Sequence, residues 1–348
     1  MRIEEIDKNF EGKLSDDGKT VFYDASRPPF TVHGLLRDED GYYRLPYSLA
    51  AQTNEGVEAL NLHTAGGRVR FMTDAGRIVI RAQMRSVTKM SHMTVTGSSG
   101  FDLYSGGVFK GAFIPPFDFE DGYTCEIETG GSEMREITIH FPLYCGVTIL
   151  EIGIPPGSGL MKAPGYAVRQ PVVFYGSSIT QGGCASRPGN AYDNILSMRL
   201  SCEHINLGFS GSAKGEWCMA EYIAGLEMSA FIMDYDHNAP DPAHLEATHG
   251  PFFEIIREKN PSLPVIMLSR PQPNPDKEDF IRRDIIKKTF DTAQLNGDRN
   301  VYFIDGIEMM NIPGGDSATV DKYHPNDLGF YLMAKAVEPV LRKALFKN

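Results

Sequence analysis

Residues 171–180 read Pro-Val-Val-Phe-Tyr-Gly-Ser-Ser-Ile-Thr, a short β-forming run that ends in a glycine and two serines. A polar, glycine-containing stretch follows, and a helical pattern begins near Asn190. Open α/β sheets place their active sites at the carboxyl ends of strands, beside helix N-termini. Glycine lets the backbone turn tightly at such a point. We therefore take Ser178 as a candidate nucleophile at the edge of a parallel sheet.

From this stretch onward, the C-terminal half alternates between strand and helix patterns. The predicted strands are 171–176, 204–207, 230–236, 264–270 and 301–305. The predicted helices are 191–202, 246–259, 278–295 and 326–346, with a shorter one within 212–226. Strands that are apolar enough to be buried on both faces, and that alternate with helices, indicate a parallel sheet covered by helices on each side.

The N-terminal half has a different pattern. Short alternating runs between Gly, Asp and Asn residues occur at 69–73, 77–82, 93–96, 138–141 and 146–152. Such alternation, with turn residues about every eight to twelve positions, predicts an antiparallel β-sandwich or jelly roll. We expect no helix of any length before the loop-rich junction at 155–166. Two domains are the default for a 348-residue chain, and we predict them at residues 1–165 and 166–348.

Composition narrows the function classes. The 42% hydrophobic and 23% charged content is that of an ordinary globular protein. A net charge of −11 argues against a nucleic-acid partner, because phosphates require a basic face. No apolar run is long enough for a membrane helix, and the first residues lack the apolar core of a secretory signal. The five cysteines are odd in number and form no CxxC pair, which favours reduced thiols and a cytoplasmic location.

Chemically capable residues follow the predicted strands at four places. Ser178 follows the first strand, Gly211 the second and Asn238 the third. Asp321 and His324 lie just before the last predicted helix. Because parallel strands end at one edge of a sheet, these residues can converge in space.

Together these residues supply what acyl transfer requires. A serine hydroxyl needs a base, and the His324 imidazole can take its proton near neutral pH. The Asp321 carboxylate can fix the orientation and tautomer of that imidazole. The N–H groups of Ser178 and Gly211 and the side-chain amide of Asn238 can bind the oxyanion. This chemistry needs no metal and no organic cofactor.

The four short sequence segments around these residues resemble, in the same order, the four sequence blocks of the SGNH or GDSL-type hydrolase superfamily. In that superfamily the catalytic aspartate precedes the histidine by three residues, as Asp321 does here. The resemblance implies a flavodoxin-like, doubly wound, five-stranded sheet and an esterase activity. By position, Ser178 resembles the nucleophile, and Asp321 and His324 the rest of the triad. Gly211 and Asn238 resemble the oxyanion donors.

The resemblance covers roughly residues 170–348 and extends upstream through one motif. Gly100-Phe-Asp-Leu-Tyr104 resembles the GxDLY signature of a β domain that precedes one SGNH subgroup. Two departures occur. Ser177 stands where the first block usually has aspartate, and the third block reads Asp236-His-Asn238-Ala instead of Gly-x-Asn-Asp. Neither departure removes a residue of the triad or an oxyanion donor.

Several of the polar residues fit other kinds of site as well. Three histidines could hold a metal instead: His237, His244 and His249. Their spacings lack the helical i, i+4 pattern of a zinc-binding pair. Asp234 and Asp236 lie two apart at a strand end, which favours a loop-orienting role over the paired carboxylates of a glycosidase. The literal Gly315-Asp-Ser317 has no strand directly before it, and we interpret it as a loop turn.

The substrate is predicted from weaker signals. Lys214, Glu216 and Arg270 follow predicted strands, and they either line the pocket or form a solvated salt-bridge set. The N-terminal β domain resembles ancillary, carbohydrate-binding domains of carbohydrate-active enzymes. We therefore expect a small-molecule or saccharide ester as substrate, with deacetylation of an acylated carbohydrate as the reaction. The alternatives are acyl transfer by the same triad and a non-catalytic glycan-binding protein. The sequence makes no prediction of oligomeric state.

Overall fold

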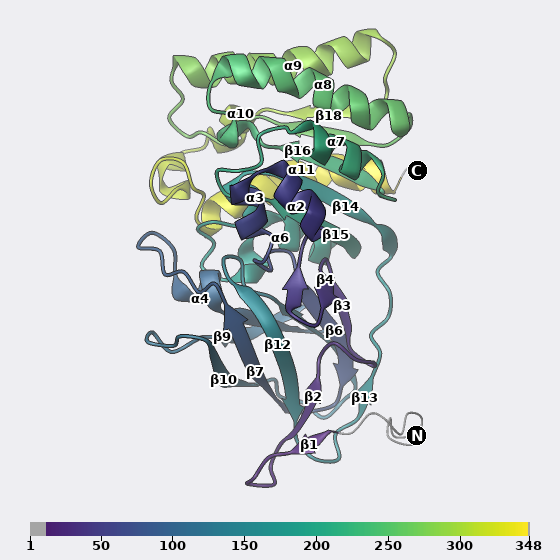
Figure 1. Cartoon of the computed structure of the whole chain (residues 1–348), viewed down its shortest axis with the longest axis vertical. Coiled ribbons are helices and arrows are strands. Elements are labelled where there is room, and N and C mark those ends of the chain that lie inside the picture. The colour runs from purple at the N-terminus through teal and green to yellow at the C-terminus, as the bar shows by residue number, and fades with distance from the viewer. Residues whose placement is uncertain (1–11, 347–348) are drawn as a thin grey trace. The chain divides into compact units, whose positions relative to one another are not determined.

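The computed structural model describes residues 12–346, which form two compact units (Figure 1). The first unit comprises the described residues up to Arg44 together with Leu62–Gly165 and Arg187–Gly189. The second comprises Leu45–Asn61, Tyr166–Ser186 and the described residues from Asn190 onward. The chain changes unit between residues 165 and 166, and in addition residues 45–61 belong to the second unit and residues 187–189 to the first.

The first unit is built from two antiparallel sheets. One has the order β1 (Lys13–Leu14), β2 (Val21–Asp24), β12 (Gly146–Ile154), β7 (Arg77–Arg85) and β10 (Gly122–Glu128). The other has the order β13 (Leu160–Met161), β6 (Arg68–Thr73), β11 (Arg135–His140), β8 (Phe101–Ser105) and β9 (Val108–Phe113), with β3 (Thr31–His33) paired to β6. A small hairpin joins β4 (Leu36–Asp38) to β5 (Gly41–Tyr43). Inward-facing aromatic and branched residues of both sheets fill one core, which confirms the predicted sandwich.

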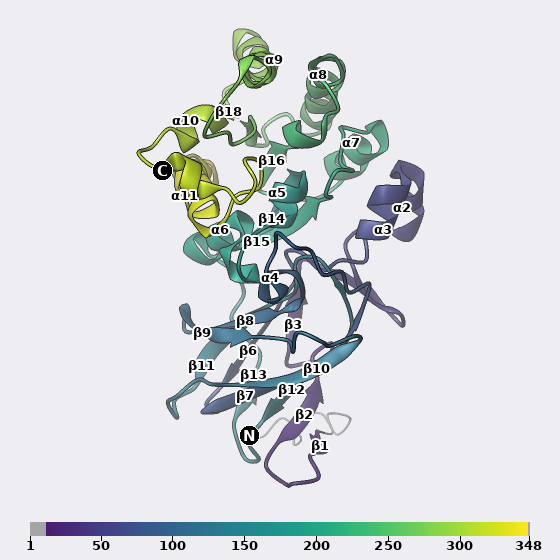
Figure 2. The same ribbon diagram turned by 90° about the vertical axis from the view of Figure 1, so that its left-hand side faces the viewer.

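Two predictions for the N-terminal half are wrong. The run at 93–96 is no strand: Val95–Ser99 forms the short helix α4, because the Thr94 hydroxyl caps it by accepting the Gly97 N–H at 3.0 Å. Residues 47–60 also form helices, α2 (Tyr47–Thr53) and α3 (Glu55–Leu60). These two helices lie beside α7 of the second unit and bury Ala50 and Val57 in its core (Figure 2). Tertiary packing stabilises helices this short, and sequence periodicity does not reveal it.

The second unit contains a five-stranded parallel sheet. Its order is β15 (Cys202–Gly208), β14 (Val168–Gly176), β16 (Ala230–Asp234), β17 (Val265–Leu268) and β18 (Val301–Ile304). In chain order this is 2-1-3-4-5, the flavodoxin-like arrangement of a doubly wound sheet. The predicted fold of the C-terminal half is therefore confirmed.

Helices cover both faces of this sheet. They are α5 (Ser178–Gln181), α6 (Tyr192–Leu200), α7 (Trp217–Ala224), α8 (Pro242–Lys259), α9 (Lys277–Leu295), α10 (Gly306–Met310) and α11 (Asp327–Leu345). Single 3₁₀ turns occur at η1 (Pro188–Asn190), η2 (Asp236–Asn238) and η3 (Gly315–Ala318). None of the helices within residues 12–346 is long and apolar enough to cross a membrane.

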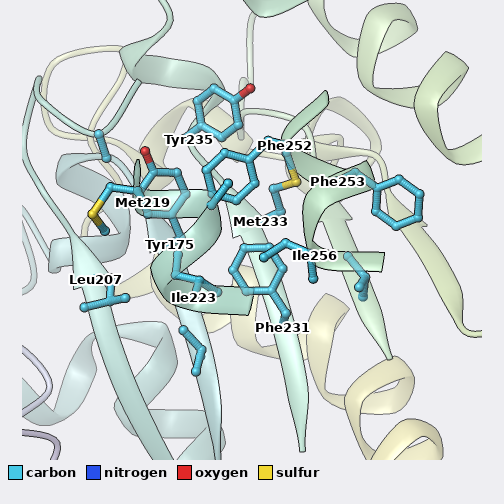
Figure 3. Close-up of a cluster of buried hydrophobic side chains, with 14 of the residues drawn as sticks. Tyr175, Leu207, Met219, Ile223, Phe231, Met233, Tyr235, Phe252, Phe253 and Ile256 are labelled. Carbon is cyan, nitrogen blue, oxygen red and sulfur yellow. The ribbon is translucent and has the colours of Figure 1, made fainter. Parts of the chain in front are cut away.

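Alternate residues of β14, which lies between β15 and β16, pack against different helices. Tyr175 of β14 stacks on Phe252 of α8 with ring centroids 5.0 Å apart, within the cluster that α7, α8 and α9 cover (Figure 3). Its neighbour Phe174 points to the other face and meets Tyr192 of α6, which stacks on Phe330 of α11. Burial on both faces explains why residues 172–175 of β14 are apolar without alternation.

Candidate active site

The turn between β14 and α5 places Ser178 at the carboxyl edge of the parallel sheet. A side chain at Gly176 would overlap the Thr180 hydroxyl and the carbonyl oxygen of Asp234, so only glycine lets α5 approach β16 this closely. The Ser177 hydroxyl caps α5 by accepting the Ile179 N–H at 3.2 Å. Ser178 is consequently the first residue of the helix.

The structure brings Ser178, His324 and Asp321 together. The Ser178 Oγ lies 3.0 Å from His324 Nε2, and His324 Nδ1 lies 2.7 Å from Asp321 Oδ2. The other oxygen of Asp321 accepts the backbone N–H groups of Tyr323 at 3.1 Å and of His324 at 2.8 Å. Burial raises the pKa of Asp321, but the hydrogen bonds from His324 and Tyr323 outweigh it, and the net pKa is lowered. An ionised Asp321 keeps the imidazole hydrogen on Nδ1 and leaves the Nε2 lone pair facing the serine hydroxyl.

Asn238 and Gly211 also meet at this edge, but they contact each other. The Gly211 N–H donates to Asn238 Oδ1 at 3.0 Å, and Asn238 Nδ2 donates to the Phe209 carbonyl at 2.9 Å. An amide nitrogen carries two hydrogens, so Asn238 keeps one for another acceptor. Gly211 has a φ of +66°, a conformation that favours glycine. The sequence predicts the Gly211 N–H as one of three oxyanion donors, beside those of Ser178 and Asn238, but in this structure its single hydrogen is directed at the Asn238 side chain.

These residues line a cavity of about 380 Å³ within the second unit. Its walls are Ser178, Ile179, Ser210, Gly211, His237, Asn238, Arg270, Tyr323 and His324. Of the three residues predicted to bind substrate, Arg270 is on this wall, whereas Lys214 and Glu216 are not. His237 and Tyr323 were missed, although each is adjacent in sequence to a residue that was predicted.

Lys214 and Glu216 have structural contacts instead. The Glu216 carboxylate accepts the Tyr175 hydroxyl at 2.7 Å and the Asn54 amide at 2.9 Å, and so ties the segment of α3 to the end of β14. Lys214 is exposed, and its carbonyl oxygen lies 2.7 Å from His244 Nε2. The sequence leaves two alternatives open for these side chains, and neither Lys214 nor Glu216 is on the wall of the Ser178 cavity.

Arg270 and His237 give the cavity its polar character. The Arg270 guanidinium donates to Asp279 at the start of α9, with an Nε–Oδ1 distance of 2.6 Å. Burial lowers the pKa of His237 to about 3, so the ring is neutral, and it hydrogen-bonds the backbone of Pro271. Tyr323 is 47% exposed, and its ring lies 6.5 Å from that of His237. The cavity thus presents a cation, a neutral imidazole and an accessible aromatic ring.

Behind the cavity, a buried carboxylate fixes α5. Asp234 Oδ2 accepts the hydroxyls of Thr180 and Tyr192, each at 2.8 Å. Burial raises the pKa of Asp234 to about 7. From the opposite neighbouring strand, Asn206 Nδ2 donates to the Thr180 carbonyl at 2.6 Å. Strands on both sides of β14 therefore hold the helix that carries Ser178, which agrees with the loop-orienting role expected of Asp234.

The remaining candidates have other partners. His244 contacts Lys214, and His249 Nδ1 lies 3.0 Å from the Thr289 hydroxyl, so the three histidines considered as metal ligands bind separate groups. Ser317 lies in η3, and its carbonyl oxygen accepts the Asn326 amide at 2.7 Å. It is not on the wall of the Ser178 cavity.

The doubly wound parallel sheet carries Ser178, His324 and Asp321 in series at its carboxyl edge, an arrangement that is typical of serine hydrolases. The chain belongs to the GDSL-like lipase/acylhydrolase family, whose model matches residues 169–342. The model of the GxDLY N-terminus of SGNH-type esterases matches residues 20–160. The protein is therefore an ester hydrolase with an SGNH-type catalytic unit.

Solved structures resemble both units. A Bacteroides ovatus protein assigned as a GDSL-like lipase is 28% identical, with a TM-score of 0.83, over 94% of this chain and 98% of that one. The salicylyl-acyltransferase SsfX3 of a tetracycline biosynthetic pathway is 18% identical, with a TM-score of 0.76, over 92% and 96%. The acetyl xylan esterase Est2A of Butyrivibrio proteoclasticus is 13% identical, with a TM-score of 0.60, over 94% and 99%. No curated protein sequence matches the chain.

Proposed function

We propose that the protein is a serine esterase that removes a small acyl group, acetate in the first instance, from a carbohydrate. The observation that carries this proposal is the continuous contact from Ser178 Oγ to His324 Nε2 and from His324 Nδ1 to Asp321. The serine and the histidine are 146 positions apart in sequence. A serine, an imidazole and a carboxylate in this series can generate a nucleophile and return its proton.

In the first half of the reaction, Ser178 Oγ attacks the ester carbonyl carbon while its proton passes to His324 Nε2. The carbonyl oxygen becomes an oxyanion, which accepts hydrogen bonds from the Ser178 N–H and the second amide hydrogen of Asn238. Gly211 supports this step by holding Asn238 Oδ1. The C–O bond to the alcohol then breaks, and His324 gives the proton to the leaving alkoxide.

In the second half, a water molecule gives one proton to His324 and attacks the acyl-enzyme carbonyl. The tetrahedral intermediate collapses, the bond to Ser178 Oγ breaks, and His324 returns its proton to the serine. The free acid leaves. Asp321 stays ionised throughout and stabilises the imidazolium, in keeping with its lowered pKa.

The carbohydrate part of the proposal is supported by the cavity and by the relatives. Arg270, His237 and Tyr323 offer a donor, a neutral imidazole and an aromatic face, which suit a hydroxylated ring better than a long acyl chain. Family two carbohydrate esterases and an acetyl xylan esterase share the fold. The acyltransferase with the same fold makes acyl transfer the second candidate, with an alcohol replacing water in the second half.

The test compares Ser178→Ala with Ser317→Ala, the serine of the literal Gly-Asp-Ser motif, on an aryl acetate. We expect Ser178→Ala to lower kcat by about 10⁴- to 10⁶-fold and Ser317→Ala to leave it within about twofold. A fluorophosphonate should label the wild type and not Ser178→Ala. Wild-type turnover in Ser178→Ala would exclude this serine, and an inert wild type would favour a non-catalytic glycan-binding protein.

A substrate panel then separates the finer alternatives. Acetylated xylan, acetylated monosaccharides and long-chain esters are compared by kcat/KM, and a clear preference for long acyl chains would reject the carbohydrate proposal. Product analysis with an added acceptor alcohol distinguishes acyl transfer from hydrolysis.

A further inference from the structure

One buried guanidinium spans the turn that carries Asn238. Arg282 of α9 is 2% exposed, and it donates from Nη1 to the carbonyl oxygen of Asp236 at 3.1 Å and from Nη2 to that of Ala239 at 3.0 Å. These two carbonyls lie on either side of His237 and Asn238, both of which line the Ser178 cavity. Arg282 itself is not on the cavity wall.

The same arginine also holds the side chain of Asp236. Its Nη1 lies 3.2 Å from Asp236 Oδ1, while Asp236 Oδ2 accepts the backbone N–H of Arg270 at 2.9 Å. Burial raises the pKa of Asp236, and Arg270 and Arg282 oppose that shift. Both carboxylate oxygens act as acceptors, as an ionised group requires. Asp236 stands where the third block of the superfamily usually has glycine. The carboxylate that this position has here binds Arg282.

The arginine is in turn fixed to its own helix. Its Nε donates to Glu278 Oε1 at 2.7 Å, one helical turn earlier. Hydrogen bonds therefore run from α9 through Arg282 to Asp236 and Ala239, the two residues that flank His237 and Asn238. Within that turn, Asn238 Oδ1 accepts the N–H of Gly211 on the loop after β15.

We propose that Arg282 is a positioning residue, which acts through Asn238 by fixing η2 where the Asn238 amide can meet the oxyanion. This inference rests on the proposed esterase function. A donor aimed at the oxyanion contributes mainly in the transition state, so its displacement lowers kcat more than it changes KM. Loss of one such donor lowers kcat by about 10²- to 10³-fold, and we expect about 10- to 100-fold for its misplacement.

The chain offers a matched control in Arg257 of α8. Its Nη1 also donates to two backbone carbonyls, of Asn260 at 2.9 Å and Leu263 at 2.7 Å, and its Nε binds Asp298 at 2.8 Å. It is largely buried, and it is not on the wall of the Ser178 cavity. Arg257→Met therefore removes a comparable set of structural contacts without touching η2.

The experiment measures kcat and KM on an aryl acetate for Arg282→Met, Arg257→Met, Asn238→Ala and the double variant Arg282→Met/Asn238→Ala. We expect a roughly 10- to 100-fold lower kcat with little change in KM for Arg282→Met, and a change within about threefold for Arg257→Met. In the Asn238→Ala background, Arg282→Met should lower kcat by less than about threefold, because the two changes remove one function. Circular dichroism and thermal melts establish that each variant is folded.

Three results would overturn the proposal: an unchanged kcat in Arg282→Met, an equal loss in Arg257→Met, or an undiminished loss in the Asn238→Ala background. If Arg282→Met does not fold, Arg282→Lys replaces it, since lysine keeps the charge but not the paired donors. A folded Arg282→Lys variant with the kcat of the wild type would also contradict the positioning role of Arg282. The proposed esterase function is tested separately, because its failure would appear as an inactive wild type.

Discussion

Two turns carry the residues around Ser178, and they are held in different ways. The turn Asp321–His324 is partly exposed, and Asp321 organises it by accepting hydrogen bonds from residues two and three positions ahead. The turn Asp236–Asn238 is buried, and it depends on Arg282, 46 positions away. The His324 base is thus oriented by residues of its own loop. The Asn238 amide, by contrast, is held in place by Arg282, a residue far away in the sequence.

The largest expected effect on kcat comes from a substitution in the turn Asp321–His324, which its own residues hold in place. Asp321→Asn removes the charge that keeps the hydrogen on His324 Nδ1, while the side-chain oxygen can still accept the backbone N–H groups. We expect kcat on an aryl acetate to fall by about 10³- to 10⁴-fold, with little change in thermal stability. A loss of less than about tenfold would show that another group orients the imidazole.

The second prediction addresses the distantly held turn. Asn238→Ala removes one oxyanion donor and leaves Ser178, His324 and Asp321 in contact, so kcat should fall by about 10²- to 10³-fold. A fluorophosphonate should label Asn238→Ala more slowly than the wild type but detectably, and it should not label Ser178→Ala. An unchanged kcat in Asn238→Ala would remove this residue from the proposed oxyanion site.

The third prediction concerns Asp234, the buried carboxylate that holds α5. The pKa of Asp234 is about 7 in the folded protein against 3.8 for the free group, so unfolding releases a proton between these values and stability falls as pH rises through this window. In Asp234→Asn the single side-chain oxygen can keep both hydroxyl bonds, since both go to Oδ2. Relative to wild type, the free energy of unfolding of the variant should rise by about 3 kcal/mol between pH 4.5 and pH 8, as measured by urea unfolding. A pH-independent difference would contradict the raised pKa.

The smallest effect is expected at Gly211. An added Cβ would meet nothing within 4 Å, so the strain comes only from the φ of +66°. Gly211→Ala should lower the free energy of unfolding by about 1–2 kcal/mol and leave kcat within about fivefold. A much larger loss of kcat would mean that the Gly211 N–H contacts the oxyanion directly.

Much of the second unit could be predicted from its sequence. Strands buried on both faces, such as 171–176, are continuous apolar runs, and the long amphipathic helices carry capping residues such as Asp276 and Asn326. The short helices at 47–60 could not be predicted, because their stability comes from burying Ala50 and Val57 in the second unit.

The residues of the candidate site also fall into those that local sequence patterns reveal and those that only the fold brings together. The sequence points to Ser178, His324 and Asp321 because each sits in a motif whose spacing reflects its chemistry, and the structure brings the three into contact. The sequence leaves the places of Lys214 and Glu216 open, since a position after a strand does not fix the direction of a side chain. Tyr323 and His237 lie beside predicted residues, but the sequence does not show that their side chains face the cavity. Arg282 lies in no motif, and only the folded chain brings it to the turn beside the cavity.

The sequence alone determined the parallel sheet, the order of its catalytic blocks and the class of chemistry, because strand burial and short-range spacing are local properties. The tertiary structure alone decided that Gly211 bonds to Asn238, that Glu216 supports α3, and that Arg282 spans η2. Each of these contacts joins residues more than twenty positions apart. Their formation depends on how whole elements pack, which no local pattern encodes.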